Sequence, residues 1–350
     1  MAVRSRRGRL VLIGAGAVAA GLIVPSIANA ATAKANWGNF DRTGIEFNTL
    51  QPSTVTIKKG DKVTFSVIGF HTVTLLGKGA KLPPLLGPSG TLTPAQNDPA
   101  GVPYWWAGTA PLIGFNGAAA APAGGTTYTG KKTVHSGLLQ GNAPKFTVTF
   151  PKVGTFTVRC VVHPNMKGKV RVLPGAASDT ATKLKARAAK EQAAQAATVQ
   201  RLVKRADKSK GPVVFIGPGT TKAETLSFNP ANRKVAPGST VTFKMAPGSE
   251  VHTVTFGPKA FVEGVAKTTF EGSGPTLAGE GFYPSDPPAA GVPSLQPTSH
   301  GNGFLNSGAL ADPGTGFPLP TSFKITFPTA GTYQYICLVH TFMRGTITVG

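Results

Sequence analysis

Residues 146–160 read FTVTFPKVGTFTVRC, and residues 323–337 read FKITFPTAGTYQYIC. The two stretches align without a gap. In each, a run of alternating apolar and polar residues leads into a Pro/Gly turn, and a second alternating run ends on a cysteine. Alternation with a period of two is typical of a half-buried β-strand, and Pro and Gly between two such runs mark a turn. The chain therefore carries the same strand, turn and strand twice.

The repeat extends well upstream of these stretches. Residues 55–65 resemble residues 233–243, and both continue to the sequence HTVT, which begins at His71 and at His252. From this histidine to the cysteine there are 89 residues in the first half and 85 in the second. Such agreement over a long span indicates that a whole domain was duplicated. We expect one domain at residues 37–174 and another at residues 212–350.

The composition favours strands and loops. The chain has 350 residues, of which 41% are hydrophobic, with 44 Gly and 30 Pro. This length allows two domains with sizeable cores, and Gly and Pro are poorly tolerated inside helices. Each half also has a long Gly/Pro-rich insertion, at about residues 77–144 and 257–320. We expect the insertions to cover the domains or to form a partner-docking surface, with the tryptophans packed beneath them.

The segment between the two halves differs in kind. Residues 178–210 contain neither Gly nor Pro, are rich in Ala, Lys, Arg and Gln, and carry a net charge of +6. This composition favours a helix. Only a thin apolar stripe runs along it, so a solvated helical spacer at residues 175–211 is our prediction. A dedicated partner-binding helix is the alternative.

The first thirty residues are predicted to be a signal peptide. A basic start, with arginines at positions 4, 6, 7 and 9, is followed by an apolar run and by the small-residue sequence Ala28-Asn29-Ala30. The run is too short to favour a membrane span, and the paired arginines resemble a twin-arginine signal. An ordinary secretory signal and an uncleaved anchor stay open as alternatives. We expect the protein to be exported to the periplasm, the cell envelope or the extracellular space.

The chain is strongly basic. Its formal net charge is +22, or +18 without the four arginines of the leader. The basic residues do not join aromatic residues in any recognisable nucleic-acid module, so we expect no nucleic acid as partner. An acidic redox protein or anionic cell-surface material is the predicted counterpart, attracted over a distance that shortens as salt rises.

Each half ends on the same arrangement of metal-binding residue types. The sequences CVVHPNM at residues 160–166 and CLVHTFM at residues 337–343 share the spacing Cys-x-x-His-x-x-Met. A thiolate, two imidazoles and a weak thioether form the ligand set of blue-copper electron-transfer sites, in which soft and borderline donors suit both Cu(I) and Cu(II). Three of the four are present in one loop, and His71 or His252 can supply the second imidazole.

This pattern resembles the cupredoxin family, and its loop is most similar to that of amicyanin-like members of the plastocyanin/azurin group. The resemblance covers both halves. It implies two Greek-key β-sandwich domains in an all-β fold, with two coppers per chain. The metal ligands that it implies are His71, Cys160, His163 and Met166, and His252, Cys337, His340 and Met343. The insertions are longer than in small cupredoxins. In the family, the loop histidine reaches the surface through an apolar patch, to which Pro164 and Phe342 would contribute here.

Other interpretations of these residues compete with the copper sites. Two cysteines in an exported protein could form a disulfide, but each lies at the same position of its own repeat with His and Met at matched offsets. His135 aligns with Asn306, and His300 has no counterpart in the first half, so neither is predicted to bind metal. Met245 is expected in a core.

An electron carrier is the function that the sequence favours. Multicopper oxidases and copper nitrite reductases recruit further histidines, as His-x-His pairs or beside the cysteine, and this chain has neither feature. No nucleophile elbow, phosphate-binding loop or zinc-protease motif is present, so we expect no enzyme activity and no small-molecule substrate. Copper storage or delivery is the alternative, and an oxidase-like or reductase-like enzyme is a weaker one.

Overall fold

The repeated strands of the sequence lie in two β-sandwiches. The structure, a computed structural model, describes residues 30–91, 96–141, 143–175, 179–271, 275–296 and 298–350. Except for Ala30, the predicted signal peptide lies outside the described residues. Residues from Ala31 to Gly350 cluster as one unit. None of the described helices is long and apolar enough to cross a membrane.

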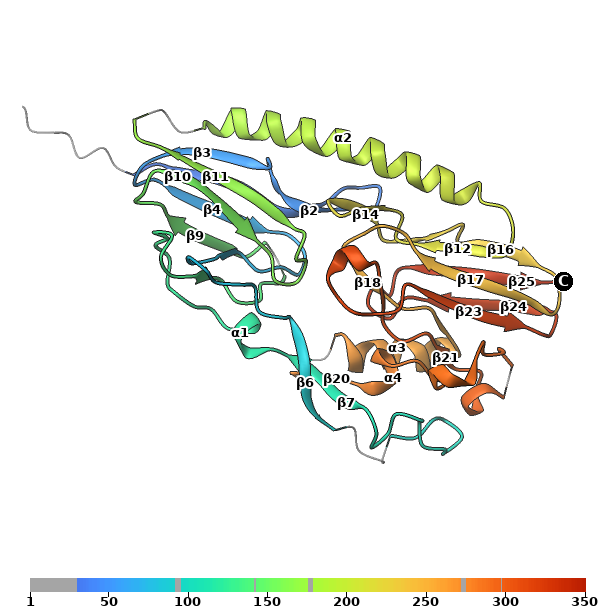
Figure 1. Ribbon diagram of the computed structural model, residues 1–350. Coiled ribbons are helices and arrows are strands. Elements are labelled where there is room, and N and C mark those ends of the chain that lie inside the picture. The colour runs from blue at the N-terminus through green and yellow to red at the C-terminus, as the bar shows by residue number, and fades with distance from the viewer. Residues whose placement is uncertain (1–29, 92–95, 142, 176–178, 272–274, 297) are drawn as a thin grey trace, which may run out of the picture. The chain divides into compact units, whose positions relative to one another are not determined.

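The first sandwich has two facing sheets (Figure 1). One contains, in spatial order, β13 (Gly219–Thr220), β14 (Ala223–Thr225), β2 (Ile45–Gln51), β1 (Thr32–Phe40), β4 (Lys62–Val67) and β9 (Lys145–Thr149). The other contains β3 (Thr54–Lys58), β11 (Lys167–Leu173), β10 (Gly154–Arg159), β5 (Thr74–Leu75) and β8 (Val134–His135). Trp37, Phe65 and Val158 are buried in the core between them. The two strands of the repeated stretch, β9 and β10, therefore belong to different sheets of one sandwich.

The second sandwich repeats this order strand by strand. Its first sheet is β15 (Phe228–Asn229), β12 (Val213–Ile216), β17 (Ser239–Met245) and β23 (Ser322–Phe327). Its second is β16 (Asn232–Val235), β25 (Arg344–Val349), β24 (Gly331–Ile336), β19 (Thr255–Phe256) and β21 (Leu305–Asn306). β12 pairs with β17 in parallel as β1 does with β4, and β25 with β16 as β11 does with β3. The predicted all-β fold with two sandwiches is confirmed; the exact domain boundaries stay predictions.

The two sandwiches share a sheet. β14 belongs to the second half of the sequence, yet it pairs antiparallel with β2 of the first sandwich, and Glu224 lies directly opposite Glu46. Both glutamates stand six residues before a cis-proline, at Pro52 and Pro230, so they occupy equivalent positions of the repeat. Antiparallel pairing of equivalent strands around equivalent residues relates the two halves by a local pseudo-two-fold axis.

The linker helix packs against this junction. α2 (Ala181–Asp207) starts at Thr180, whose hydroxyl accepts a hydrogen bond from the Lys183 backbone N–H, and it contacts strands of both sandwiches (Figure 1). Leu184 joins the first core, and Val199 packs with Ile45 of β2 and Ala223 of β14. The predicted helix is therefore present, but the prediction of a solvated spacer is wrong, because its thin apolar stripe is buried.

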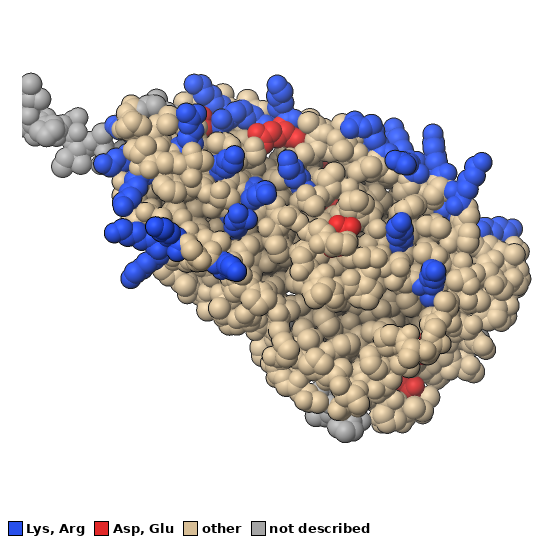
Figure 2. All heavy atoms as spheres, viewed as in Figure 1, with Lys and Arg blue, Asp and Glu red and all other residues tan. Residues whose placement is uncertain are grey.

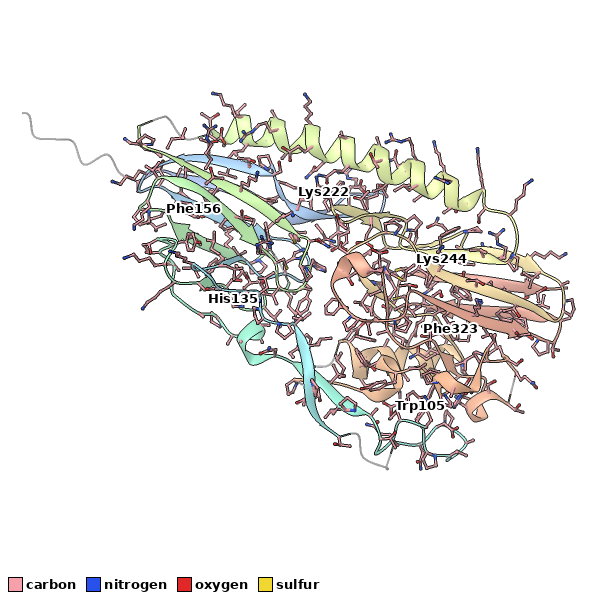
Figure 3. The ribbon with its side chains drawn as sticks, viewed as in Figure 1. Trp105, His135, Phe156, Lys222, Lys244 and Phe323 are labelled. Atoms are coloured by element: carbon pink, nitrogen blue, oxygen red, sulfur yellow. The ribbon has the colours of Figure 1, made fainter. Side chains whose placement is uncertain are left out.

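The insertions interlock across the two halves. The first contains β6 (Leu86–Thr91), β7 (Pro111–Phe115) and α1 (Gly117–Ala120); the second contains α3 (Lys259–Thr269), β20 (Thr276–Leu277), α4 (Gly279–Phe282), β22 (Leu310–Ala311) and the short 3-10 turns η1 (Pro288–Ala290), η2 (Ser299–Gly301) and η3 (Pro313–Thr315). β7 pairs with β20, and β22 pairs with β18 (Val251–His252). Trp106 is buried in a cluster with Phe304 and Leu338 of the second half. Trp105, labelled in Figure 3, packs against the same cluster.

Candidate metal centres

The first predicted cluster is assembled in the structure. The Nδ1 atoms of His71 and His163 are 3.0 Å apart, and each lies 3.9 Å from the Cys160 Sγ atom. His71 is placed by hydrogen bonds between its backbone and that of Leu139, while Cys160 follows the end of β10. All three side chains are buried. An isolated β-bridge, a strand end and a turn thus direct one sulfur and two nitrogens toward one point.

The loop of the first cluster is held by its own backbone. The Cys160 N–H donates to the Met166 carbonyl at 3.1 Å, and the Met166 N–H donates to the His163 carbonyl at 2.8 Å. Met166 is fully buried in the first core. These two bonds fold the Cys-x-x-His-x-x-Met spacing into a compact turn, which brings the methionine back beside the cysteine.

The second cluster has the same geometry. The Cys337 Sγ atom lies 3.7 Å from His252 Nδ1 and 3.8 Å from His340 Nδ1, and the two nitrogens are 3.2 Å apart. The loop bonds of Cys337, Met343 and His340 have the same lengths, 3.1 and 2.8 Å. The duplication predicted from sequence therefore reaches the level of individual atoms.

A threonine beside each strand histidine supports the cysteine. The Thr72 N–H lies 3.4 Å from the Cys160 Sγ atom, and its hydroxyl accepts from the backbone N–H that follows the cysteine, at 2.7 Å. Thr253 makes the equivalent contacts with Cys337 and Leu338 at 3.4 and 2.8 Å. An N–H directed at sulfur stabilises the thiolate form, so the surroundings favour the state of cysteine that binds metal.

The pKa shifts within the clusters favour a thiolate beside charged imidazoles. Burial alone raises the pKa of the Cys160 thiol, but hydrogen bonds from His163 and His71 outweigh it and hold this pKa well below its usual value. Burial alone lowers the pKa of His252, but interactions with the Cys337 sulfur and the Glu224 carboxylate raise it to about 10. A thiolate surrounded by imidazole groups is a site in which a metal cation can replace protons.

The outer nitrogens of three histidines meet two glutamates that the sequence analysis missed, and a third missed glutamate lies beside Glu250. His163 Nε2 lies 2.6 Å from Glu250 Oε1, His340 Nε2 lies 3.8 Å from Glu250 Oε2, and His252 Nε2 lies 3.9 Å from Glu224 Oε2. Burial and the neighbouring Glu250 raise the pKa of the third, Glu46. The matched positions of Glu46 and Glu224 in the repeat were the available signal, in a chain with only 14 acidic residues.

A cavity of about 1000 Å³ lies between the two clusters and the insertions. His163, His340 and Glu250 form part of its wall, and most of the remaining lining is apolar, including Phe70 and Phe317. The predicted apolar surface patch at both loop histidines differs from what the structure shows. His163 is only 4% exposed and faces Glu250, while Pro164 packs near Gly316. The insertions and the second half cover this loop.

The second loop is more open. The His340 side chain is 14% exposed, against 5% for His163. Phe342, whose ring centroid lies 6.1 Å from that of His340, is 66% exposed. His71 and His252, the histidines upstream of each loop, are completely buried. The two clusters thus differ in access although the distances between their sulfur and nitrogen atoms are nearly equal.

The structure also shows the state of the cysteines and the partners of the two histidines outside the clusters. Cys160 and Cys337 are both free, each in its own cluster. His135 Nδ1 bonds the Thr74 hydroxyl at 2.8 Å, as Asn306 bonds Thr255, so these contacts hold neighbouring strands together. His300 lies between Asp98 and Asp286, 3.3 Å from each carboxylate. Met245 is buried in the second core, as expected.

The donor set fits a copper ion. Each cluster offers one thiolate sulfur and two imidazole nitrogens within 4.8 Å of one another, and the methionine of each loop is buried nearby. Among the described residues, neither cluster contains an Asp or a Glu carboxylate. Sulfur and imidazole without carboxylate oxygen match copper better than magnesium or calcium.

Comparisons with known proteins identify cupredoxins as structural neighbours. No protein-family model matches the chain, and no curated protein matches it. Among solved structures, a reduced Cu(I) form of an amicyanin mutant shows 20% identity, covers 41% of this chain and 89% of its own, and has a TM-score of 0.21. Oxidised plastocyanin from Dryopteris crassirhizoma shows 21% identity over 39% of this chain and 99% of its own, with a TM-score of 0.21. A purple cupredoxin from Nitrosopumilus maritimus shows 17% identity over 40% and 100%, with a TM-score of 0.22. Each of these proteins matches about two fifths of this chain.

Proposed function

We propose that this protein is a copper-binding electron carrier with one type 1 copper site in each half. The observation that carries the proposal is the duplicated cluster, in which sulfur and two Nδ1 atoms converge with nearly equal distances in both halves. The ligands would be His71, Cys160, His163 and Met166, and His252, Cys337, His340 and Met343. Bound there, copper supplies one-electron chemistry.

The protein's own residues would keep the geometry fixed while the charge of the site changes. The three strongest ligands come from a strand and from a loop whose backbone bonds to itself, so their positions do not depend on the metal. Thr72 and Thr253 hold the cysteine sulfur, and burial excludes water. A rigid, dry site lets an electron be gained or lost with little rearrangement.

Retention of copper is favoured over delivery. His71, Cys160, His252 and Cys337 are completely buried, so a metal bound to them would be shielded from solvent on their side. A copper delivery protein has to hand over its metal, which requires exposed ligands. We also infer that the protein is no enzyme, because every histidine beyond the two clusters, His135 and His300, has a structural partner instead.

Export and an acidic redox partner complete the proposal. The leader sequence and the net charge of +18 beyond it support both. Figure 2 shows Lys and Arg gathered over α2 and the first sandwich, with few acidic residues on the same face. Such a surface attracts acidic proteins or anionic cell-envelope material at low ionic strength.

The test compares the visible spectra of the copper-loaded protein and its Cys160→Ser and Cys337→Ser variants. Each substitution removes one thiolate, so each variant should lose about half of the thiolate-to-copper absorption. Ser136→Ala serves as a control, because this buried hydroxyl directly follows β8 and bonds only backbone groups, those of Val73 and Gly137. If both cysteine variants kept the full absorption, copper binding at these sites would be wrong.

A further inference from the structure

Glu250 lies between the two clusters and contacts both. Its Oε1 atom is 2.6 Å from His163 Nε2, and its Oε2 atom is 3.8 Å from His340 Nε2. In both histidines the Nδ1 atom faces the cysteine. The outer nitrogens of the two loop histidines therefore meet the two oxygens of one carboxylate.

The pseudo-two-fold arrangement explains why the two loops face each other. The pairing of β2 with β14, with Glu46 opposite Glu224, places the same end of each sandwich at the junction. Glu250 itself breaks the symmetry. It stands two residues before His252, where the first half has Gly69, two residues before His71. A second glutamate at the position of Gly69 would collide with His71, because even a Cβ there would lie 2.9 Å from His71 Nε2.

The Glu250 carboxylate is held in place by both halves. The Asn48 side-chain amide donates to Ser249 Oγ at 2.8 Å and to Glu250 Oε1 at 3.4 Å. The Ser249 N–H and hydroxyl both donate to Glu224 at 2.6 Å. Glu250 is therefore a fixed part of the junction between the halves, and it can orient both histidines.

Access to the two clusters is unequal. The first loop is covered by the second half: Asn165 donates to the Gly314 carbonyl, and Pro164 packs near Gly316. The second loop exposes Phe342 beside His340. A partner protein can approach the second cluster at this loop, while the first cluster is reached through the interior.

We propose that the two clusters form a relay, in which electrons arrive at the His340 loop and pass through the Glu250 carboxylate and His163 to the first cluster. This proposal rests on the proposed copper sites. In the internal step one site gives up one electron and the other gains it, and no atom or proton moves. The route consists of covalent bonds within two imidazoles and a carboxylate, one short charge-assisted hydrogen bond and one 3.8 Å contact. Bonded atoms couple two redox sites better than an open gap of the same length does.

The experiment is stopped-flow reduction of the fully oxidised, copper-loaded protein by ferrous EDTA. This bulky anion should be excluded from an apolar cavity that contains carboxylates, so it reports on the exposed loop. In the unaltered protein both sites should bleach together, because the first is filled through the second. In Glu250→Leu half of the colour should bleach in a separate, slower phase. In Cys337→Ser, which lacks the receiving site, the remaining colour should bleach slowly.

Two further variants sharpen the result. Glu250→Gln keeps a side chain of the same shape but can accept a hydrogen bond only through its single oxygen, so it should also separate the two phases. Glu271→Gln removes an exposed carboxylate from the wall of the same cavity, and a single fast phase is expected. In the copper-free protein, the imidazole ¹H–¹⁵N signal of His163 Nε2 should be visible and protected from exchange, and it should be lost in Glu250→Leu.

The outcomes separate this inference from the proposed function. If no copper binds, the proposed function itself fails. If two coppers bind but the first site in Cys337→Ser bleaches as fast as in the unaltered protein, that site has its own access and the relay is wrong. An unchanged single phase in both Glu250 variants, or the absence of the protected His163 signal, would overturn the role of Glu250.

Discussion

Two glycines leave room for the buried strand histidines. Gly38 has a φ of +79°, and a Cβ on it would lie 2.4 Å from His71 Nε2 and 2.4 Å from the Ile68 carbonyl oxygen. Gly217 is its equivalent in the second half, where a Cβ would lie 2.9 Å from His252 Nε2. Each cluster thus depends on a residue without a side chain that is not itself a ligand.

Substitution of Gly38 should disturb the first cluster specifically. Gly38→Ala is expected to lower the free energy of unfolding by more than the roughly 1–2 kcal/mol that a left-handed alanine costs, and to weaken copper binding in the first half. Gly44→Ala is the matched control, since Gly44 also has a φ of +79° but has open space around its Cβ position. Denaturant unfolding and copper titration measure the two effects. Equal losses in the two variants would show that His71 tolerates the added methyl group.

The His300 contacts should make stability depend on pH. Its hydrogen bond with Asp286 raises the pKa of His300, and the nearby Asp98 adds to this rise against the effect of burial. A histidine with a raised pKa stabilises the fold fully below its unfolded-state pKa of about 6.5, and this contribution is lost as pH rises through the folded-state value. His300→Gln should therefore destabilise the protein more at pH 5.5 than at pH 9, measured by denaturant unfolding. A pH-independent difference would mean that His300 acts only through packing against Tyr104.

At the scale of the elements, α2 shows what the sequence could predict and what it could not. The absence of Gly and Pro predicted the helix, because local propensity decides whether a helix can form. Its packing was not predictable, because a few small apolar residues suffice when the surface beneath is the flat junction of β2 and β14. That junction joins strands of different halves, and local patterns carry no information about it. The strand–turn–strand units and the Cys-x-x-His-x-x-Met loops were predictable because they are local and repeated.

Leu184 tests whether α2 stabilises the protein. Because Leu184 is buried against the first core, Leu184→Ala should lower the free energy of unfolding by about 2–5 kcal/mol. Lys190→Ala, an exposed substitution on the same helix, should change it by less than about 0.5 kcal/mol. Guanidinium unfolding of the two variants gives the comparison. Similar small effects of both would restore the interpretation of a solvated spacer.

For the whole molecule, the distribution of charge should control encounters with partners. Lys and Arg gather over α2 and the first sandwich (Figure 2), and attraction to an acidic redox protein is screened beyond about 8 Å at physiological salt. We expect an acidic redox protein to exchange electrons faster than a basic one at low salt, and to lose this advantage as salt rises. Second-order rates across a salt series measure it. A rate that did not change with salt would mean that the positive charge serves attachment to anionic cell-surface material and not docking of a redox partner.

The burial of the first cluster also depends on how the two halves pack together. Sequence predicted both clusters of two histidines and a cysteine, because these residues recur at matched spacing, but it placed both loop histidines at the surface. The structure buries His163 because the insertions and the second half close over the first loop, and Glu250 occupies the position next to it. Such burial arises only when the two halves meet, so the glutamates could not be recognised as part of the site from their local sequence.

The copper content of the full chain tests the central claim most directly. Native mass spectrometry of the protein after copper addition should show two coppers per chain, and one in each of the Cys160→Ser and Cys337→Ser variants, with both cysteines of the copper-free protein reduced. A chain that binds no copper, or a Cys160–Cys337 disulfide in the native protein, would contradict the assignment of one copper site to each half.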